Sequence, residues 1–169
     1  MPRLEVKMPL HLSSELVWEA LRKEIFAVLG VVSAKGEART SGIVYAVFDS
    51  KLYIVTGQDT WKVRHIRQNP HVSITVTIPK RIPLMPWIKI PAATITFSGT
   101  ASILDPKQVG KSVLHSLLRG LEPDEETLAT MCVIEIQPVG EFVTYGVGIP
   151  LMTMRHPEKA RGRAPVVSG

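Results

Sequence analysis

Apolar and polar residues alternate along much of the chain, which is the pattern of strands with one buried face. In HVSITVTI (71–78) every second residue is apolar, and in AATITFSGTASI (92–103) the other positions carry mostly threonine and serine. We therefore expect strands with one core face and one hydroxyl-rich face. Further strands are predicted at 25–33, 38–49, 51–56 and, as one or two strands, 131–146.

The connections between these strands are short, which limits how the strands can pair. AKGE after residue 33 and Asp49-Ser50 form turns. Parallel neighbours would need crossovers of about a dozen residues, so the pairing is expected to be antiparallel. Prolines interrupt residues 79–91, which we expect to be a loop. About six strands around one core predict a mainly β fold, either a closed or a half-closed barrel.

Two amphipathic segments are expected to form helices that flank the barrel. Residues 13–24 begin with Ser13 and Ser14, either of which can cap a helix, and their apolar residues recur at helical spacing. Residues 106–118 follow Asp105, which is expected to cap them, and Gly120 stands just past their end. The apolar stripe of the first helix consists of Leu16, Val17, Ala20 and Leu21.

Length and composition indicate one domain in a reducing compartment. The chain has 169 residues, and no apolar run approaches the roughly 18 residues of a membrane span. Its first residues lack the apolar core of a signal peptide, and its one cysteine, Cys132, cannot form an internal disulfide. Both features favour the cytoplasm. Cys132 stands in the apolar run MCVIEI and is expected to be buried.

The net charge of +5 is unevenly distributed. Residues 155–169 hold four basic residues and one acid, so the preceding residues are nearly neutral. We therefore divide the chain into a domain at 1–148, with its N-terminal helix, and a basic C-terminal tail at 149–169. The nearly neutral domain and the scarcity of aromatic residues argue against nucleic-acid binding, for which the tail would be the obvious element.

A group of cations follows one of the predicted strands. In VTGQDTWKVRHIRQNP (55–70) the strand stops at Thr56-Gly57, and Lys62 precedes two arginines. A helix that begins near Asp59 or Thr60 exposes backbone N–H groups and a partial positive charge, which favour an anion. The hydroxyl of Thr60 and the charge of Lys62 add to this. The stretch therefore predicts a phosphate site.

A neighbouring strand offers further ligands, and a simpler explanation exists. Arg39 and Ser41 alternate onto one face of that strand and could reach the same place. Alternatively, the stretch is a surface helix with an ordinary cap and a solvated cationic face. Trp61 and Trp87 either pack in the core or cover a flat ligand. The sequence has no Walker loop, no Rossmann glycine triplet, no zinc-ligand histidine spacing and no G-x-S-x-G elbow.

The order of the motifs resembles the pyridoxamine 5′-phosphate oxidase-like, flavin-binding split-barrel family. A GxxRTSGxV strand is followed by LYIVTG, TWK, NPHVSITV, FSGTASI, a helix and IEIQPVGEF, over roughly residues 15–148. The resemblance implies a homodimer of six-stranded antiparallel split β-barrels, with FMN at the subunit interface. It also implies an oxidoreductase that transfers hydride between the flavin and a small-molecule substrate. Other members bind deazaflavin or haem, and a carrier without turnover is a further alternative.

The resemblance also implies which residues surround the cofactor. One strand would line the flavin with Arg39, Thr40 and Ser41. The next strand and its loop would contact the ring and ribityl chain through Thr56, Gly57 and Gln58. Thr60 and Lys62 would hold the phosphate. Trp87 and Thr94 would lie near the flavin ring.

A second subunit would cover two surfaces that a single barrel leaves exposed. One is the hydroxyl-rich face of residues 92–103. The other consists of apolar residues that we expect to point outward from the strand at 38–48, namely Ile43, Tyr45 and Val47.

The chain departs from pyridoxamine 5′-phosphate oxidase itself where that enzyme would hold its substrate. The C-terminal Arg-His-Asp-Arg motif is replaced by MRHPEKARGR (154–163). In TITFSG, Thr94 and Thr96 stand where glutamine and arginine would be expected. We therefore expect a different substrate, with the tail either unfolded or closing over the flavin.

Overall fold

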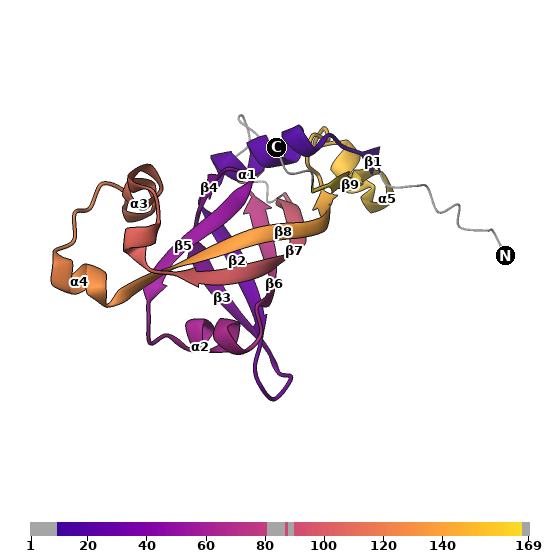
Figure 1. The fold of residues 1–169 in the computed structure, drawn as a ribbon. Coiled ribbons are helices and arrows are strands. Elements are labelled where there is room, and N and C mark those ends of the chain that lie inside the picture. The colour runs from indigo at the N-terminus through magenta and orange to yellow at the C-terminus, as the bar shows by residue number, and fades with distance from the viewer. Residues whose placement is uncertain (1–9, 81–86, 88–89, 167–169) are drawn as a thin grey trace.

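The strands of the protein form one curved sheet (Figure 1). The computed structural model describes residues 10–80, 87 and 90–166. Neighbouring strands follow the order β1-β9-β8-β7-β6-β2-β3, and β5 pairs with both β4 and β8. The strands are β1 (Leu10–His11), β2 (Phe26–Val32), β3 (Ala38–Val44), β4 (Ala46–Phe48), β5 (Lys51–Gly57), β6 (His71–Ile78), β7 (Ala93–Leu104), β8 (Met131–Tyr145) and β9 (Arg161–Pro165). The helices are α1 (Ser14–Lys23), α2 (Trp61–Gln68), α3 (Lys111–Leu118), α4 (Glu125–Ala129) and α5 (Pro157–Ala160), with 3-10 turns at Pro106–Gln108 and Thr153–Arg155.

This architecture confirms the expected mainly β split barrel with flanking helices. The predicted strands are all present, and every pairing among them is antiparallel. The predicted strand at 38–49 is divided into β3 and β4, and the segment at 131–146 forms the single strand β8. The short strands β1 and β9 were not predicted. They pair with each other in parallel, which makes the sheet mixed.

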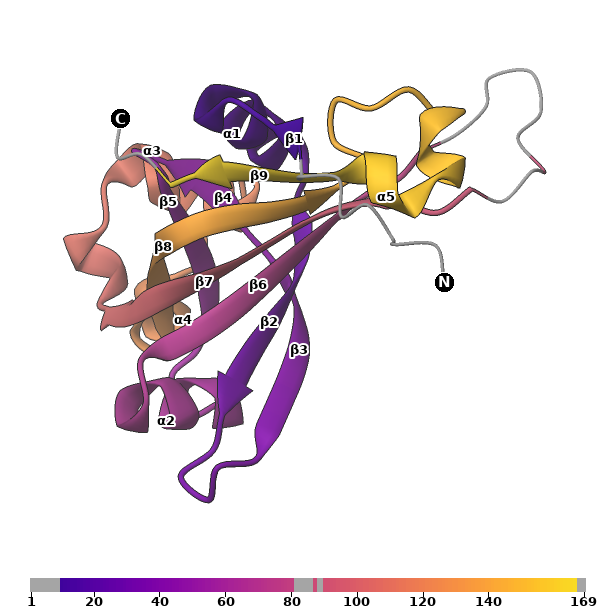
Figure 2. The same cartoon turned by 90° about the vertical axis from the view of Figure 1, so that its right-hand side faces the viewer.

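The strand that runs through β3 and β4 pairs along only part of its length with β5, so the barrel is closed at the β4 end and open at the β3 end. β3 pairs with β2, whereas β4, which continues from β3, pairs with β5. No ladder joins β3 to β5 within the described residues, so the split lies between the start of β3 and the end of β5. α2 lies at this opening and buries Val63 and Ile66. Figure 2 shows α2 at the opposite end of the barrel from α1, β1 and β9.

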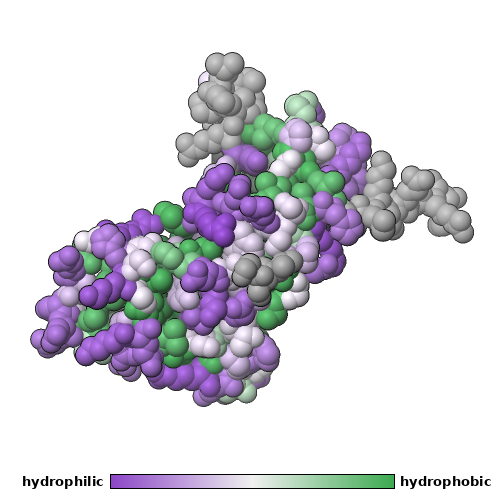
Figure 3. Space-filling model, turned by 45° about the horizontal axis from the view of Figure 1, so that its top comes forward, coloured by the Kyte–Doolittle hydropathy of each residue, from purple (hydrophilic) through white to green (hydrophobic). Residues whose placement is uncertain are grey.

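The interior is filled by alternate residues of the strands. Phe142 packs edge-on against Trp18 and Phe97, with ring centroids 5.2 Å apart in both pairs. The predicted core faces of 71–78 and 92–103 are confirmed, and the hydroxyls of Thr75 and Thr96 on the outer face lie 3.1 Å apart. On the face shown in Figure 3, apolar side chains emerge in groups separated by polar ones. Fully buried aliphatic residues include Leu29, Leu52, Ile54, Ile74, Ile95, Ile134 and Ile136.

The expectation that Ile43, Tyr45 and Val47 point outward is wrong. Ile43 and Tyr45 are buried in the barrel, and Val47 is half-buried and packs against the same core. The Tyr45 hydroxyl donates a hydrogen bond to the carbonyl of Leu21 at 2.8 Å. The outward residues are Phe26 and Val44, which pair across β2 and β3 and are 49% and 47% exposed. The sequence could not show which face of this strand is buried, because the residues on both faces of residues 42–47 are apolar.

The predicted caps of the two flanking helices are confirmed, whereas the predicted length of the second helix is not. Ser13 caps α1 by accepting a hydrogen bond from the backbone of Leu16 at 3.2 Å, and Trp18 joins the buried residues of this helix. The predicted helix at 106–118 begins with the expected cap at Asp105 but is interrupted. Val109 is extended, so a 3-10 turn precedes α3 and Gly110 becomes the cap of α3.

The basic C-terminal segment is built into the sheet. β9 pairs with the end of β8 and with β1. Arg163 of β9 also pairs with Glu141 of β8 at 2.9 Å. Residues 149–166 therefore extend the barrel at the end that lies away from α2, and within these residues the tail is not unfolded.

Candidate functional site

The first turn of α2 lies at the split of the barrel. Thr60 is its N-cap, but the hydroxyl donates a hydrogen bond to the carbonyl of Gly57 at 3.0 Å and does not accept one from the helix. Backbone N–H groups in the first turn of a helix have no acceptor within it. No side chain caps those of α2, so they are available to an anion, which the partial positive charge of the helix start favours.

A cavity of about 410 Å³ lies between β3 and α2. It is lined by Arg39 and Thr40 from β3 and by Trp61 and His65 from α2. The rings of Trp61 and His65 have centroids 5.8 Å apart and form an aromatic wall. The structure thus brings two of the predicted β3 residues to the predicted helix across the split.

Lys62 adds positive charge near the end of β5. Burial raises the pKa of the Cys132 thiol, and the charges of Arg67 and Lys62 act against this shift. Cys132 pairs with Thr56 in the β5–β8 ladder, so both cations also lie within electrostatic range of Thr56. The buried Cys132 agrees with the sequence prediction.

Three of the predicted residues have contacts that limit their part in a cofactor site. Nε2 of Gln58 donates hydrogen bonds to the carbonyls of Ala129 and Met131, at 2.9 Å each, and so ties the loop before α2 to β8. The Ser41 hydroxyl donates to a neighbouring backbone carbonyl at 3.1 Å. A Cβ at Gly57 would meet only a threonine methyl at 3.6 Å, so the packing of this chain does not require glycine there.

Two predicted residues lie away from α2. Thr94 pairs with Thr77 near the end of β6, whereas α2 leads into the start of β6 at His71. Six residues of strand span about 20 Å, so Thr94 cannot contact a ligand phosphate at α2 of the same chain. Trp87 is 73% exposed and is not among the residues that line the cavity. Neither residue therefore contributes to this cavity within one chain.

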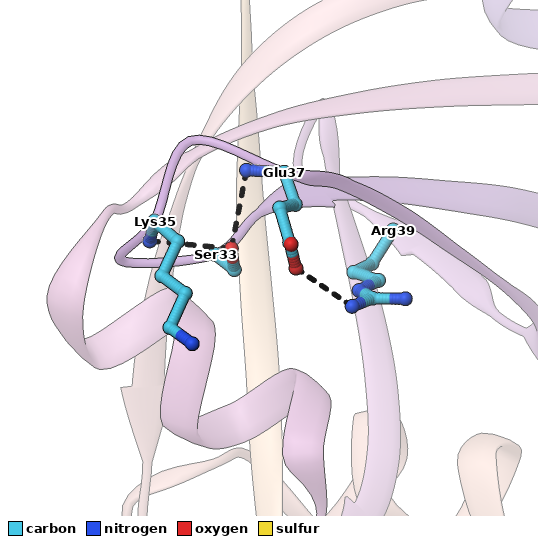
Figure 4. Close-up of polar contacts among 4 residues, drawn as sticks. All are labelled: Ser33, Lys35, Glu37 and Arg39. Atoms are coloured by element: carbon cyan, nitrogen blue, oxygen red, sulfur yellow. Dashed lines mark hydrogen bonds and ion pairs between the residues drawn. The ribbon is translucent and has the colours of Figure 1, made fainter.

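Sequence reasoning missed the acid that holds Arg39. Glu37 stands just before β3, and its carboxylate lies 2.7 Å from the Arg39 guanidinium (Figure 4). The signal was their i, i+2 spacing, which places both side chains on one face of a strand. His65 was also overlooked as a lining residue, although the i, i+4 spacing places it beside Trp61 on the helix.

Other features of the described residues lie apart from this cavity. A second cavity, of about 440 Å³, lies between the end of α1, β4 and α3, and none of the predicted cofactor residues lines it. Within the ranges that the structure describes, no three acidic, histidine or cysteine side chains gather as metal ligands. In the same ranges, no helix has the length and apolar character needed to cross a membrane.

Comparison with known proteins identifies a family. The family model described as pyridoxamine 5′-phosphate oxidase matches residues 14–144. The match extends from α1 nearly to the end of β8, and it therefore includes both walls of the cavity. A comparison with curated proteins gives no match.

Solved structures share the fold at low sequence identity. An F₄₂₀ reductase is 22% identical with a TM-score of 0.53, covering 73% of this chain and 94% of its own. An FAD-binding protein from Mesorhizobium loti is 19% identical with a TM-score of 0.55, covering 75% and 90%. A heme-binding protein from Mycobacterium smegmatis is 14% identical with a TM-score of 0.60, covering 86% of this chain and 56% of its own.

Proposed function

The chain belongs to the pyridoxamine 5′-phosphate oxidase family, and from this premise we propose that it is an FMN-dependent oxidoreductase. The observation that carries the proposal is the cavity at the split, where Arg39 and Thr40 face the aromatic wall of α2. A cation, a hydroxyl and aromatic rings are the groups that a phosphorylated, flat cofactor would contact.

The donor set around the first turn of α2 suits the phosphate of FMN. The uncapped backbone N–H groups, the Lys62 ammonium and the Arg39 guanidinium all favour a dianion. Thr60 would exchange its hydrogen bond to Gly57 for one to a phosphate oxygen. When bound, the flavin supplies the hydride chemistry, and the residues of the chain hold and orient it.

We further propose that the protein acts as a homodimer in the cytoplasm. Phe26 and Val44 form an exposed apolar pair on the outer face of β2 and β3, and the hydroxyl face of β6 and β7 lies beside it. A partner on this face would bring its Thr94 and Trp87 toward the cavity, which residues of one chain enclose on only two sides. The homodimer thus accounts for the distance between the two groups of predicted residues.

Haem is a second candidate ligand, because His65 lines the cavity. Histidine is the commonest axial ligand of haem iron in globins and peroxidases, so a flat haem with an imidazole ligand could occupy the same space. Deazaflavin would use the same phosphate contacts as FMN. A carrier without turnover, with either a flavin or haem, is the alternative to an enzyme.

Two measurements test the proposal. The purified protein is titrated with FMN, deazaflavin and haem, following flavin fluorescence and the haem absorption band. Binding of FMN well below the millimolar range supports the proposal, whereas binding of haem alone contradicts it. Steady-state reduction and reoxidation of the loaded protein with nicotinamide donors and small acceptors then separates an enzyme from a carrier.

A further inference from the structure

The cavity of about 440 Å³ at the α1 end of the barrel, opposite α2 (Figure 2), is separate from the proposed cofactor site. It is enclosed by the end of α1, the bend between β3 and β4, and the end of α3. Its lining shares no described residue with the cavity at the split. Ligand sites in proteins usually have volumes of about 300–1,000 Å³, so a small molecule fits this space. We call it the α1–α3 cavity.

Much of the lining of the α1–α3 cavity is apolar and incompletely covered. Ile25 is 52% exposed and Val44 is 47% exposed, although both are large aliphatic residues. Phe48 belongs to the same lining, and its ring is held edge-on against the ring of Tyr53, with centroids 6.4 Å apart. A ligand that covered these side chains with an apolar group would remove hydrophobic surface from water. The lining therefore favours a ligand with an apolar body.

Two arginines from different helices line the same cavity. Arg22 lies in the last turn of α1, and Arg119 is the C-cap of α3. Neither forms an ion pair with a described acidic side chain. Glu24 is the one acid among the lining residues, all of which belong to the described ranges, so two cations face one acid. This excess of positive charge favours an anionic group on the ligand.

The backbone of Arg119 is unusual for an arginine. Its φ of 51° and ψ of 43° lie in the left-handed region, where glycine or asparagine is the usual residue after a helix. Gly120 follows with a φ of 76°. Because the left-handed conformation strains a residue that has a Cβ, helix termination alone does not explain an arginine at this position. The place of its side chain in the lining of the cavity gives it a role there.

A simpler explanation is that both arginines stabilise their helices. The C-terminal end of a helix carries a partial negative charge, which nearby cations stabilise. However, Lys23 already supplies such a cation in the last turn of α1. Helix stabilisation also does not explain why the arginines of two helices line one cavity beside exposed apolar residues. The two explanations predict different effects of removing Arg119, and this difference makes them separable.

We propose that the α1–α3 cavity binds a small carboxylate with an apolar body, such as an alkyl or aryl carboxylate. Arg22 and Arg119 would hold the carboxylate, because a guanidinium group matches its two oxygens with parallel N–H donors. Ile25, Val44 and Phe48 would cover the apolar body. This site goes beyond the proposed function and does not depend on a cofactor, because the two cavities have separate linings.

The probe is octanoate, and two related molecules separate its head group from its body. Acetate has the same head group with almost no apolar body, and octylammonium has a similar body with the opposite charge. In calorimetric titrations of the full chain, octanoate should bind at least about tenfold more tightly than either. Its affinity should fall as salt is added, because exposed charges are then screened. Saturating FMN should leave the affinity for octanoate unchanged.

The variant Arg119→Gly distinguishes ligand binding from helix stabilisation. It removes the guanidinium and also relieves the strained backbone. It should bind octanoate about fivefold more weakly, from the loss of one exposed charge, and unfold at an equal or higher urea concentration. Arg22→Ala should lose a similar factor in affinity. The matched control is Lys23→Ala, which removes the neighbouring cation of the same turn without changing the cavity lining, and it should bind octanoate as the wild-type protein does.

Several results would overturn the proposal. It is wrong if octanoate binds no more tightly than acetate and octylammonium, if FMN displaces octanoate, or if both arginine variants keep the wild-type affinity. A less stable Arg119→Gly variant with unchanged affinity would show that the arginine only stabilises the helix.

A second subunit is the other candidate occupant, because Val44 also belongs to the proposed dimer face. If octanoate does not bind and light scattering shows that Arg22→Ala shifts the protein toward the monomer, the partner fills the cavity and the proposal is wrong. The proposed function stands in all these cases, since it rests on the cavity at the split. Conversely, octanoate binding by a protein that takes up no FMN would support this site and contradict the proposed function.

Discussion

The guanidinium of Arg39 and the carboxylate of Glu37 form an ion pair at 2.7 Å beside the proposed phosphate site. The same guanidinium lines the cavity between β3 and α2. If a cofactor phosphate binds here as proposed, it must share the Arg39 guanidinium with Glu37 or displace the Glu37 carboxylate from it. The carboxylate would then position the arginine and at the same time repel the negative charge of the cofactor.

Replacing this acid should strengthen cofactor binding. With Glu37→Gln, Arg39 is released from its partner and the repulsion of the phosphate is removed. Half-exposed ion pairs are worth about 0.2–1 kcal/mol, so the affinity for FMN should rise by up to about fivefold. Glu126→Gln on α4 makes the same change of charge elsewhere and should have no effect. Weaker binding in Glu37→Gln would mean that the pair holds Arg39 in its binding position.

The homodimer can be tested on its proposed interface. Light scattering at micromolar concentration should give twice the chain mass of 18.6 kDa. Val44→Asp places a charge beside Phe26 on the exposed apolar face, and it should shift the protein toward the monomer and weaken FMN binding with it. A wild-type mass of 18.6 kDa would exclude the dimer, and a dimeric Val44→Asp variant would place the interface elsewhere.

We predict that the protein is not a pyridoxamine 5′-phosphate oxidase in activity, although it belongs to that family. Arg155-His156 is followed by Pro157-Glu158, and His156 lies 3.6 Å from Glu158. Thr94 and Thr96 stand where glutamine and arginine would be expected. FMN-loaded protein supplied with pyridoxamine 5′-phosphate and oxygen should form no pyridoxal 5′-phosphate. Turnover above about one per second, an ordinary enzymatic rate, would contradict this.

Tyr53 should make the fold sensitive to alkaline pH. Burial raises the pKa of Tyr53 to about 12, with further contributions from the hydrogen bond to Glu135 at 2.9 Å and from nearby negative charges. A group with a raised pKa in the folded state stabilises it fully below its ordinary pKa and loses this contribution as pH rises through the folded value. The free energy of unfolding should therefore fall between pH 10 and 12.

The variant Tyr53→Phe isolates this contribution. In urea unfolding experiments it should show a shallower decrease in stability over that pH window than the wild-type protein. The decrease should not vanish, because burial also raises the pKa of Tyr45. An identical pH profile in both proteins would show that Tyr53 ionises in the folded state as it does in the unfolded one.

Strands with one polar face could be predicted from sequence almost to the residue. β6 matches its predicted range, because the alternation of Val72 and Ile74 with Ser73 and Thr75 is possible only with one face buried. The faces of β3 could not be assigned in the same way, since Val44 and Tyr45 are both apolar and only pairing with β2 decides between them.

The candidate site was predictable where local chemistry defines it. The start of α2 at Trp61 follows from a strand end and a cap, whereas the role of Lys62 stays a prediction. The contribution of Glu37 depends on which face of β3 meets α2, and the distance of Thr94 depends on the pairing of β6 with β7. Both depend on how strands far apart in the sequence pair, which the residues next to Glu37 or Thr94 in the sequence do not indicate.

The most direct test of the account is the affinity of the Lys62→Ala variant for FMN and for riboflavin, which lacks the phosphate. A charge-assisted hydrogen bond is worth about 1.5–3 kcal/mol, so the variant should bind FMN about 10- to 100-fold more weakly than the wild-type protein and bind riboflavin unchanged. Equal losses for both ligands, or wild-type binding of FMN no tighter than that of riboflavin, would contradict a flavin phosphate at the start of α2.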